Sequence, residues 1–394
     1  MFGEAQSAHR IEDRRFLRGE GRYLDDIALS GCAAMVLLRS PHAHAEITAL
    51  DVEAAREAPG VLAVLTGEDL ARMGVKPIPC LAEIRNWKET PSFLPPRPVL
   101  AQGHVRYAGE PVVAIVAETA HEARDAAELV EIDYEILPVA ATIDEALAAE
   151  TPLWREAPDN LCFDWSYGDA SAVERLFASA ARIVSIELEN NRVAGLSLET
   201  RGAIGEYDRH DERFVLHVSS QGGHAIRRIL CQNVLDIPEG RMRVITPDVG
   251  GGFGPKIFAY AEYALVLLAA RQIGRPVKWV CERMESLQSD TQGRGQRTVA
   301  ELALDSDGKF LAMRMDTLAD VGAYPAQHGP NIATVAGNGL HPSVYRVGAV
   351  SVRVRGVFTN TVPIDSYRGA GRPEVIYAVE RLVDAAARQT GIDP

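Results

Sequence analysis

The sequence predicts an α+β protein whose second part is a mixed, layered α/β region. From 31 to 139, short strand-like runs alternate with short helices, as in a compact α+β domain. From 242 to 281, a strand, a glycine loop, a helix and another strand follow one another, which is typical of layered α/β structure. Between these regions lies a stretch with several prolines and few periodic apolar positions. We therefore expect domains at 15–137 and 169–394, joined by a linker at 138–168.

Local signals predict the elements of the first domain. A run of apolar residues at 112–117 indicates a strand. Thr119 with Glu122 forms a capping box, which predicts a helix to about Leu129. Apolar and acidic residues then alternate at 130–136, the period of a strand with one buried face.

The second domain begins with a predicted helix at 171–181 and a strand at 183–188. A strand at 242–247 leads into the glycine loop and an Ala- and Leu-rich helix. Gly274 stands where a helix C′ residue belongs, and a strand follows at 277–281. Because this helix is apolar on most faces, we expect it to be buried.

A final helix is predicted at 374–389, with Val379 and Leu382 on one face. Asp393 and Pro394 then form the usual opening of a helix, with Asp as N-cap and Pro in the first turn. We expect a new element to begin there.

Composition limits the classes of function. The net charge of −13, without any concentrated Lys/Arg run, argues against a nucleic-acid partner. The apolar stretch at 259–273 is short and interrupted by Glu262 and Arg271, so no membrane span is expected. Residues 1–22 lack the apolar core of a secretory signal, which predicts a cytoplasmic protein.

Cysteine and histidine spacing predicts no metal site within this chain. The five cysteines form no C-x-x-C pair and are expected to be free thiols: Cys32, Cys80, Cys162, Cys231 and Cys281. His42 and His44 form an H-x-H pair, for which a turn or a packed strand end is the better interpretation.

The glycine loop is the first candidate for a binding site. Removing side chains from a whole turn lets backbone N–H groups approach a bulky or anionic ligand. The alternative is a tight turn that needs positive φ. A Walker A loop is excluded, because Lys256 is followed by Ile257 and the required spacing is absent. The candidate binding residues are Gly250, Gly251, Gly252, Phe253 and Gly254.

A second cluster places two arginines among small residues just before the final helix. Arg368 and Arg372 are suited to an anionic group or a metal-bound oxygen. Alternatively, Arg372 pairs with Glu374, which itself stands in a helix first turn.

Taken together and in order, eight motifs resemble the N-terminal portion of the molybdopterin-binding large subunit of molybdenum hydroxylases, the xanthine oxidase, aldehyde oxidase and carbon monoxide dehydrogenase family. The likeness runs from about 10 to 394. The motifs are GEGRYLDD at 19–26, SPHAHA at 40–45, YAGEP at 107–111, ETRG at 199–202, SSQ at 219–221, GGGFGPK at 250–256, GAY at 322–324 and YRGAGRPE at 367–374.

The resemblance implies an a/b hammerhead domain followed by the first part of the molybdopterin-binding domain. It implies a molybdenum–molybdopterin cofactor, in bacteria commonly the cytosine dinucleotide form. Gln221 corresponds to the glutamine that hydrogen-bonds an oxo ligand of molybdenum, Phe253 lies where the loop meets metal and pterin, and Arg368 falls beside the substrate cavity. Their alternatives are an exposed polar residue, a core aromatic and a surface ion-pair partner. His224, close after Gln221, is expected to play at most a supporting role.

Three departures from the family bear on substrate and completeness. Carbon monoxide dehydrogenases carry a copper-bridging cysteine directly after the arginine, where this chain has Gly369. Purine hydroxylases carry a glutamate directly after the loop lysine, where this chain has Ile257. An aldehyde or a less polar N-heterocycle fits better. The family's catalytic glutamate, near the end of the subunit, has no counterpart here.

The leading hypothesis is therefore one subunit of a split hydroxylase. A second molybdopterin-domain subunit would supply the catalytic glutamate. Iron–sulfur and FAD subunits would carry 2Fe-2S clusters and FAD for the electrons of the small-molecule substrate, because the cysteines here cannot hold such clusters. The alternative is a truncated, non-catalytic remnant. A phosphate-binding NTPase is disfavoured by Ile257 and by the lack of an acidic metal motif.

Overall fold

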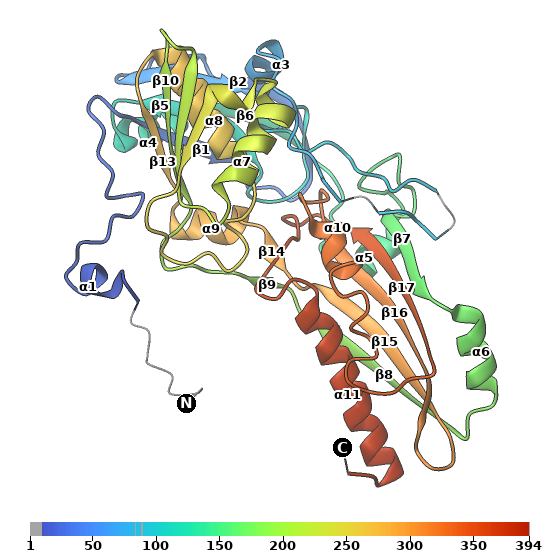
Figure 1. Cartoon of the computed structure of the whole chain (residues 1–394). Helices are drawn as coiled ribbons and strands as arrows, with labels where there is room; N and C mark the ends of the chain where they lie inside the picture. Colours follow the sequence, from blue (N-terminus) through green and yellow to red (C-terminus); the bar gives the residue numbers. More distant parts are fainter. Residues whose placement is uncertain (1–9, 83, 88–89, 394) are drawn as a thin grey trace, which may run out of the picture.

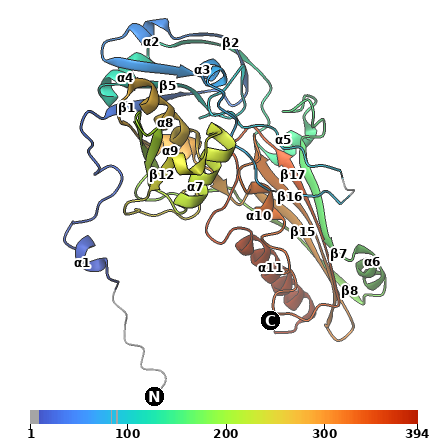
Figure 2. The same cartoon turned by 45° about the horizontal axis from the view of Figure 1, so that its top comes forward.

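A computed structural model describes residues 10–82, 84–87 and 90–393 (Figure 1). In two views, a body built around one sheet stands beside a second sheet that extends away from it with a long helix along its length (Figures 1 and 2). The first sheet has seven strands, in the order β12 (Met242–Ile245), β11 (Arg213–Val218), β10 (Gly202–Asp208), β13 (Val277–Val280), β1 (Ala33–Arg39), β5 (Pro111–Ala117) and β3 (Val61–Thr66).

This sheet combines strands from both predicted domains, 15–137 and 169–394. β1 pairs in parallel with β13, with Ala33 opposite Val277. β1 also pairs antiparallel with β5, and β13 with β10. The predicted strands at 112–117, 242–247 and 277–281 are confirmed here as β5, β12 and β13.

Helix α8 (Ala261–Ile273) is the buried helix of the strand, loop, helix, strand unit. Every residue from 261 to 270 is buried, as predicted from its apolar faces. A Cβ on Gly205 of β10 would lie 2.4 Å from the Val266 carbonyl oxygen, so glycine permits this close approach of helix and strand. Gly274 ends the helix at φ +70°, as its position predicted.

The second large sheet has five strands, in the order β7 (Leu161–Gly168), β17 (Ala349–Phe358), β16 (Phe310–Gly322), β15 (Gln296–Leu304) and β8 (Arg182–Asn190). Helices cover both faces of this sheet. Neighbouring residues of a strand point to opposite sides, so each strand packs against both layers. Met313 of β16 packs in the core beside α11 (Arg372–Thr390), whereas Ala312 packs beside α6 (Ala170–Ala178).

Smaller elements complete the fold. A three-stranded sheet contains β4 (His104–Val105), β2 (Ala45–Asp51) and β6 (Glu131–Ile136), and β14 (Gln292–Gly293) pairs with β9 (Val193–Ala194). The remaining helices are α1 (Asp13–Phe16), α2 (Glu53–Glu57), α3 (Gly67–Arg72), α4 (Ala120–Ala127), α5 (Ile143–Ala148), α7 (Gly223–Ile229), the π-helix Leu230–Leu235, the 3-10 helix Glu239–Arg241, α9 (Arg283–Ser289) and α10 (Gly329–Ala333).

Several local predictions are confirmed with small shifts at the ends. The Thr119 hydroxyl accepts from the Glu122 N–H at 3.2 Å and caps α4. The helix predicted at 171–181 is α6, and the final helix is α11. The helix start expected at Asp393-Pro394 falls partly on Pro394, which lies outside the described residues.

The segment 138–168 contains more structure than a connecting segment needs. It includes α5 and β7, and β7 pairs antiparallel with β17. Sequence alone missed this strand because only Cys162 and Phe163 of its residues are buried. Where the chain divides into domains stays a prediction. Within the described ranges, no helix is both long and apolar enough to cross a membrane.

Candidate functional site

The glycine loop lies between β12 and α8 and is tied down at both ends. The Gly250 N–H donates to Glu199 Oε2 at 2.8 Å, and the Gly254 N–H donates to Gln221 Oε1 at 2.9 Å. Between them, the N–H groups of residues 251–253 donate to no acceptor in the part of the chain that the structure describes. The loop therefore presents consecutive backbone donors.

Gln221 follows β11 and closes one side of the loop. Its backbone N–H donates to the Lys256 carbonyl at 2.9 Å. A Cβ on Gly252 would lie 2.4 Å from Gln221 Cδ, so only glycine leaves room for the amide. Since Oε1 is occupied by Gly254, the amide NH₂ of Gln221 is the group left to donate to a ligand.

Arg368 closes the other side. Its N–H donates to the Phe253 carbonyl at 2.8 Å, and a Cβ on Gly254 would lie only 2.1 Å from the Ser366 oxygen. Gln221, the loop and Arg368 are thus brought together, as the sequence predicts. Arg368 is exposed, and its guanidinium forms no ion pair with a residue of the described ranges.

Phe253 is held in an unusual conformation for a non-glycine residue. Its φ is +52°, and 39% of the residue is exposed. A core aromatic would be neither strained nor exposed to this degree, so this interpretation of Phe253 is wrong. The ring lies beside Gly251, whose Cβ would be 3.1 Å from Phe253 Cε2.

Glu199, within the ETRG motif, anchors the loop and was not among the predicted site residues. Besides the Gly250 N–H, its Oε2 accepts from Lys256 Nζ at 2.8 Å and from the Ser219 hydroxyl at 2.5 Å. Burial alone would raise the pKa of Glu199, but these donors hold it below its usual value. Lys256 is 2% exposed and serves inside the fold.

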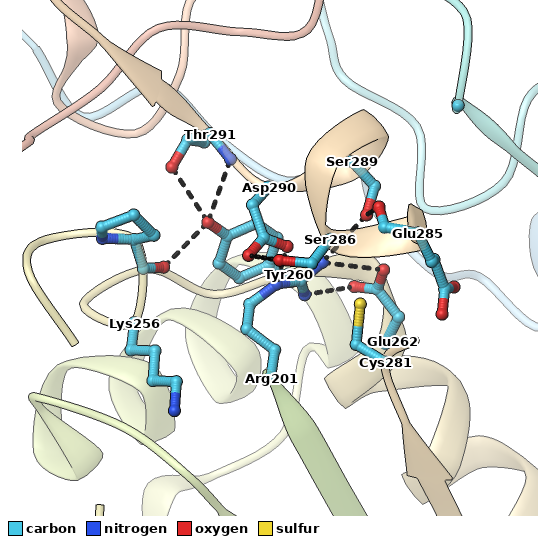
Figure 3. Close-up of polar contacts among 12 residues, drawn as sticks. Arg201, Lys256, Tyr260, Glu262, Cys281, Glu285, Ser286, Ser289, Asp290 and Thr291 are labelled. Atoms are coloured by element: carbon cyan, nitrogen blue, oxygen red, sulfur yellow. Dashed lines mark hydrogen bonds and ion pairs between the residues drawn. The ribbon is translucent and has the colours of Figure 1, made fainter. Parts of the chain in front are cut away.

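Behind the loop lies a buried network of charges (Figure 3). Arg201 Nε donates to Asp290 Oδ1 at 2.6 Å, and its NH1 donates to Glu262 Oε2 at 3.1 Å. Burial favours protonation of Glu262, yet the charges of Arg201 and Arg39 hold its pKa well below the usual range. Tyr260, under the Arg201 guanidinium at 3.7 Å, donates to the Pro255 carbonyl at 2.8 Å. The network thereby supports the loop.

The glutamate of the second cluster has a different partner from the one weighed in the sequence. Glu374 pairs with Arg294 at 2.8 Å, while Arg372 donates to the Gly369 and Ala370 carbonyls. The pairing of Arg372 with Glu374 is therefore wrong. Glu374 is 4% exposed, and its other oxygen, Oε2, has no partner among the described residues.

Asp365 lies just before the arginine motif and is fully buried. Burial raises its pKa to about 7, although the His328 and Ser366 N–H groups donate to its oxygens at 2.9 and 2.7 Å. Its neighbours therefore hold a carboxyl group that protonates near neutral pH.

Two histidines considered in the sequence, His44 and His224, lie in different surroundings. His44 is buried before β2, with Nδ1 2.6 Å from the Pro138 oxygen, as expected of a packed strand end. His224 lines an open pocket of about 460 Å³ together with Gln221.

At the start of the glycine loop, Asp248 accepts hydrogen bonds from the Arg15 guanidinium and from the Arg22 N–H, and these donors lower its pKa to about 2.

Comparison with protein families places this geometry. Residues 153–394 match the molybdopterin cofactor-binding domain, and residues 18–138 match the a/b hammerhead domain of aldehyde oxidase and xanthine dehydrogenase. The chain belongs to the xanthine dehydrogenase and aldehyde oxidase family. The predicted fold, a hammerhead domain followed by a molybdopterin-binding domain, is confirmed.

Individual relatives share one third of the residues. The chain is 33% identical to the carbon monoxide dehydrogenase large chain of Hydrogenophaga pseudoflava, over 100% of this chain and 49% of that one. It is 34% identical to the nicotine 6-hydroxylase large subunit of Paenarthrobacter nicotinovorans, over 98% and 46%. Quinoline 2-oxidoreductase from Pseudomonas putida 86 superposes with a TM-score of 0.90 at 36% identity, over 98% and 48%. The chain spans about half the length of these relatives.

Proposed function

We propose that this chain forms the cofactor side of the active site of a molybdenum hydroxylase, which oxidises an N-heterocycle or an aldehyde with oxygen from water. The observation that carries the proposal is the loop at 250–254, held between Gln221 and Arg368, whose N–H groups at 251–253 have no acceptor among the described residues. A Cβ at Gly252 would clash with Gln221 Cδ at 2.4 Å, so glycine keeps the Gln221 amide beside the N–H donors of the loop, and this set of donors fits an oxygen-rich group.

Each residue has a separate task in this proposal. When bound, the molybdenum cofactor accepts two electrons from the substrate and provides the site of oxygen transfer. The loop N–H groups and the Gln221 amide would hold that group by donating hydrogen bonds to its oxygens. Arg368, exposed and without an ion pair among described residues, orients a polar or anionic part of the substrate by its positive charge.

Two positions support the choice of substrate class. Gly369 has φ +99°, and a Cβ there would lie 2.4 Å from Pro373 Cγ, so the position disfavours a copper-bridging cysteine. Ile257 packs its apolar side chain against the main core and offers no hydrogen bond to a purine. The names of two relatives, nicotine 6-hydroxylase and quinoline 2-oxidoreductase, agree with an N-heterocycle.

We assign the remaining parts of the enzyme to the half of the relatives that this chain does not match. The relatives are about twice as long as the matched region, and the catalytic glutamate would come from the second half, on a second molybdopterin-domain subunit or on a continuation of this polypeptide. Iron–sulfur and FAD subunits would pass on the electrons. The cofactor would carry the cytosine dinucleotide, and the complex would work in the cytoplasm.

The test is to co-produce the chain with a polypeptide that matches the second half of these relatives. We expect the purified complex to contain molybdenum, to release cytidine monophosphate on acid hydrolysis, and to transfer ¹⁸O from water to quinoline or to an aromatic aldehyde. A complex without molybdenum would refute the proposal and favour a non-catalytic remnant.

A matched pair of variants links the result to the loop. Gly252→Val places a Cβ 2.4 Å from Gln221 Cδ, so it must displace the Gln221 amide from the loop and should abolish molybdenum binding. Gly240→Val is the control, because a Cβ at Gly240 meets no atom within 4 Å. If both variants retain molybdenum, the loop does not hold the cofactor.

A further inference from the structure

Arg294 joins β14 to β15 in a backbone conformation that non-glycine residues rarely adopt. Its φ is +65°, within the left-handed region. Such a conformation costs about 1 kcal/mol and persists only where neighbouring contacts stabilise it. The side chain of Arg294 is only 12% exposed, and its guanidinium makes these contacts.

The guanidinium joins three parts of the second cluster. NH1 pairs with Glu374 Oε1 at 2.8 Å, and NH2 donates to the Arg368 carbonyl at 2.9 Å. The guanidinium carbon also lies 4.9 Å from the centre of the Tyr367 ring. A Cβ on the preceding Gly293 would lie 2.3 Å from Tyr367 Cβ, so this segment presses directly on the motif.

These contacts fix the backbone of Arg368 from both sides. Its N–H is held by the Phe253 carbonyl, and its carbonyl is held by Arg294. No ion pair with a described residue directs the Arg368 side chain, so its direction depends on this backbone. Small errors in such a direction are costly, because orientation contributes strongly to catalysis.

We propose that Arg294 is a positioning residue that aims Arg368 at the substrate. This inference rests on the proposed function. Arg294 serves two acceptors at once through a planar fork, which the single ammonium of lysine cannot reproduce. Arg294 therefore acts on the reaction only through Arg368. We expect its effect to disappear when the guanidinium is lost or when Arg368 is replaced.

The first test needs no turnover. In the complex, hydrogen exchange at the Arg368 amide should become at least about tenfold faster in Arg294→Gln. The amide itself donates to Phe253, but without the charge-assisted hydrogen bond of Arg294 the backbone of Arg368 opens more often. Arg297→Gln is the matched control, because Arg297 lies nearby in β15 but pairs with Asp144 at the surface. Unchanged exchange in Arg294→Gln would overturn the proposal.

The second test is a double-mutant cycle on kcat/KM. Arg294→Lys should lower kcat/KM about tenfold or more, as loss of one charge-assisted hydrogen bond implies, with the molybdenum content unchanged. In the Arg368→Ala background the same change should have no further effect. If the two substitutions together lower kcat/KM by the product of their separate effects, the proposal is overturned. A wild-type complex that turns over no substrate refutes the proposed function instead, while the exchange measurement still decides whether Arg294 holds Arg368.

Discussion

Glu199→Gln should destabilise the protein strongly, because it removes the counter-ion of a buried ammonium. Lys256 Nζ has two partners at 2.8 Å, Glu199 and the Ser219 hydroxyl, and its side chain is 2% exposed. Breaking one partner of a buried ion pair costs about 3–5 kcal/mol. The glutamine amide still accepts one hydrogen bond, so we expect a loss of about 3 kcal/mol of unfolding free energy at pH 7.

The effect has a defined dependence on pH. The folded-state pKa of Glu199 is lowered, so its contribution is present above the unfolded pKa near 4.5 and is lost as pH falls through the folded value. The difference between wild type and Glu199→Gln should therefore shrink below pH 4.5. Urea denaturation followed by circular dichroism measures both quantities.

Two further variants separate charge from packing. Glu199→Gln combined with Lys256→Met removes the unpaired ammonium and should recover at least about 1 kcal/mol. Glu206→Gln is the control, because Glu206 is partly exposed and pairs with His217, a contact worth at most about 1 kcal/mol. The reasoning is refuted if the unfolding free energy of Glu199→Gln lies within 1 kcal/mol of the wild-type value at pH 7.

Three other changes test separate features. Gly254→Ala should lower stability by more than about 2 kcal/mol in thermal denaturation, since φ is +117° and the new Cβ would lie 2.1 Å from the Ser366 oxygen; a wild-type melting curve would contradict this. Asp365 has a folded pKa of about 7 against an ordinary 3.8, so its contribution to wild-type stability should fall as pH rises between these values and stay level above them. Asp365→Asn should lack that slope and be about 4 kcal/mol more stable relative to wild type at pH 8 than at pH 3, by urea denaturation. Gly369→Cys should bind no stoichiometric copper by mass spectrometry, because its Cβ meets Pro373; one copper per chain would show that the loop can adapt.

Local features of the fold were predictable because short-range chemistry determines them. Gly274 ends α8 by its left-handed conformation, and Thr119 caps α4 with its own hydroxyl. The pairing of β1 with β13 has no such local signal, since it depends on strands brought together only by the complete fold. Strand β7 was missed for a related reason, because pairing at a sheet edge leaves much of it polar and exposed.

The candidate site was predictable where motifs place backbone and side chain together. The meeting of Gln221, the loop and Arg368 follows from matched motifs, and the structure brings them into contact. The supports could not be predicted, because they are long-range pairings of ordinary charged residues. Glu199 is within a motif but gives no sign of its partner, and Arg294 reaches Glu374 across the fold.

The parallel pairing of β1 with β13 also bears on how this chain can be divided. The two family-matched segments, 18–138 and 153–394, contribute strands to one hydrogen-bonded sheet. Cutting the gene between them would expose an unpaired edge on each fragment, and such edges invite aggregation. Calorimetry on the intact chain should therefore show the hammerhead segment melting together with the sheet that carries the glycine loop, and libraries that recombine relatives should keep both segments from one parent.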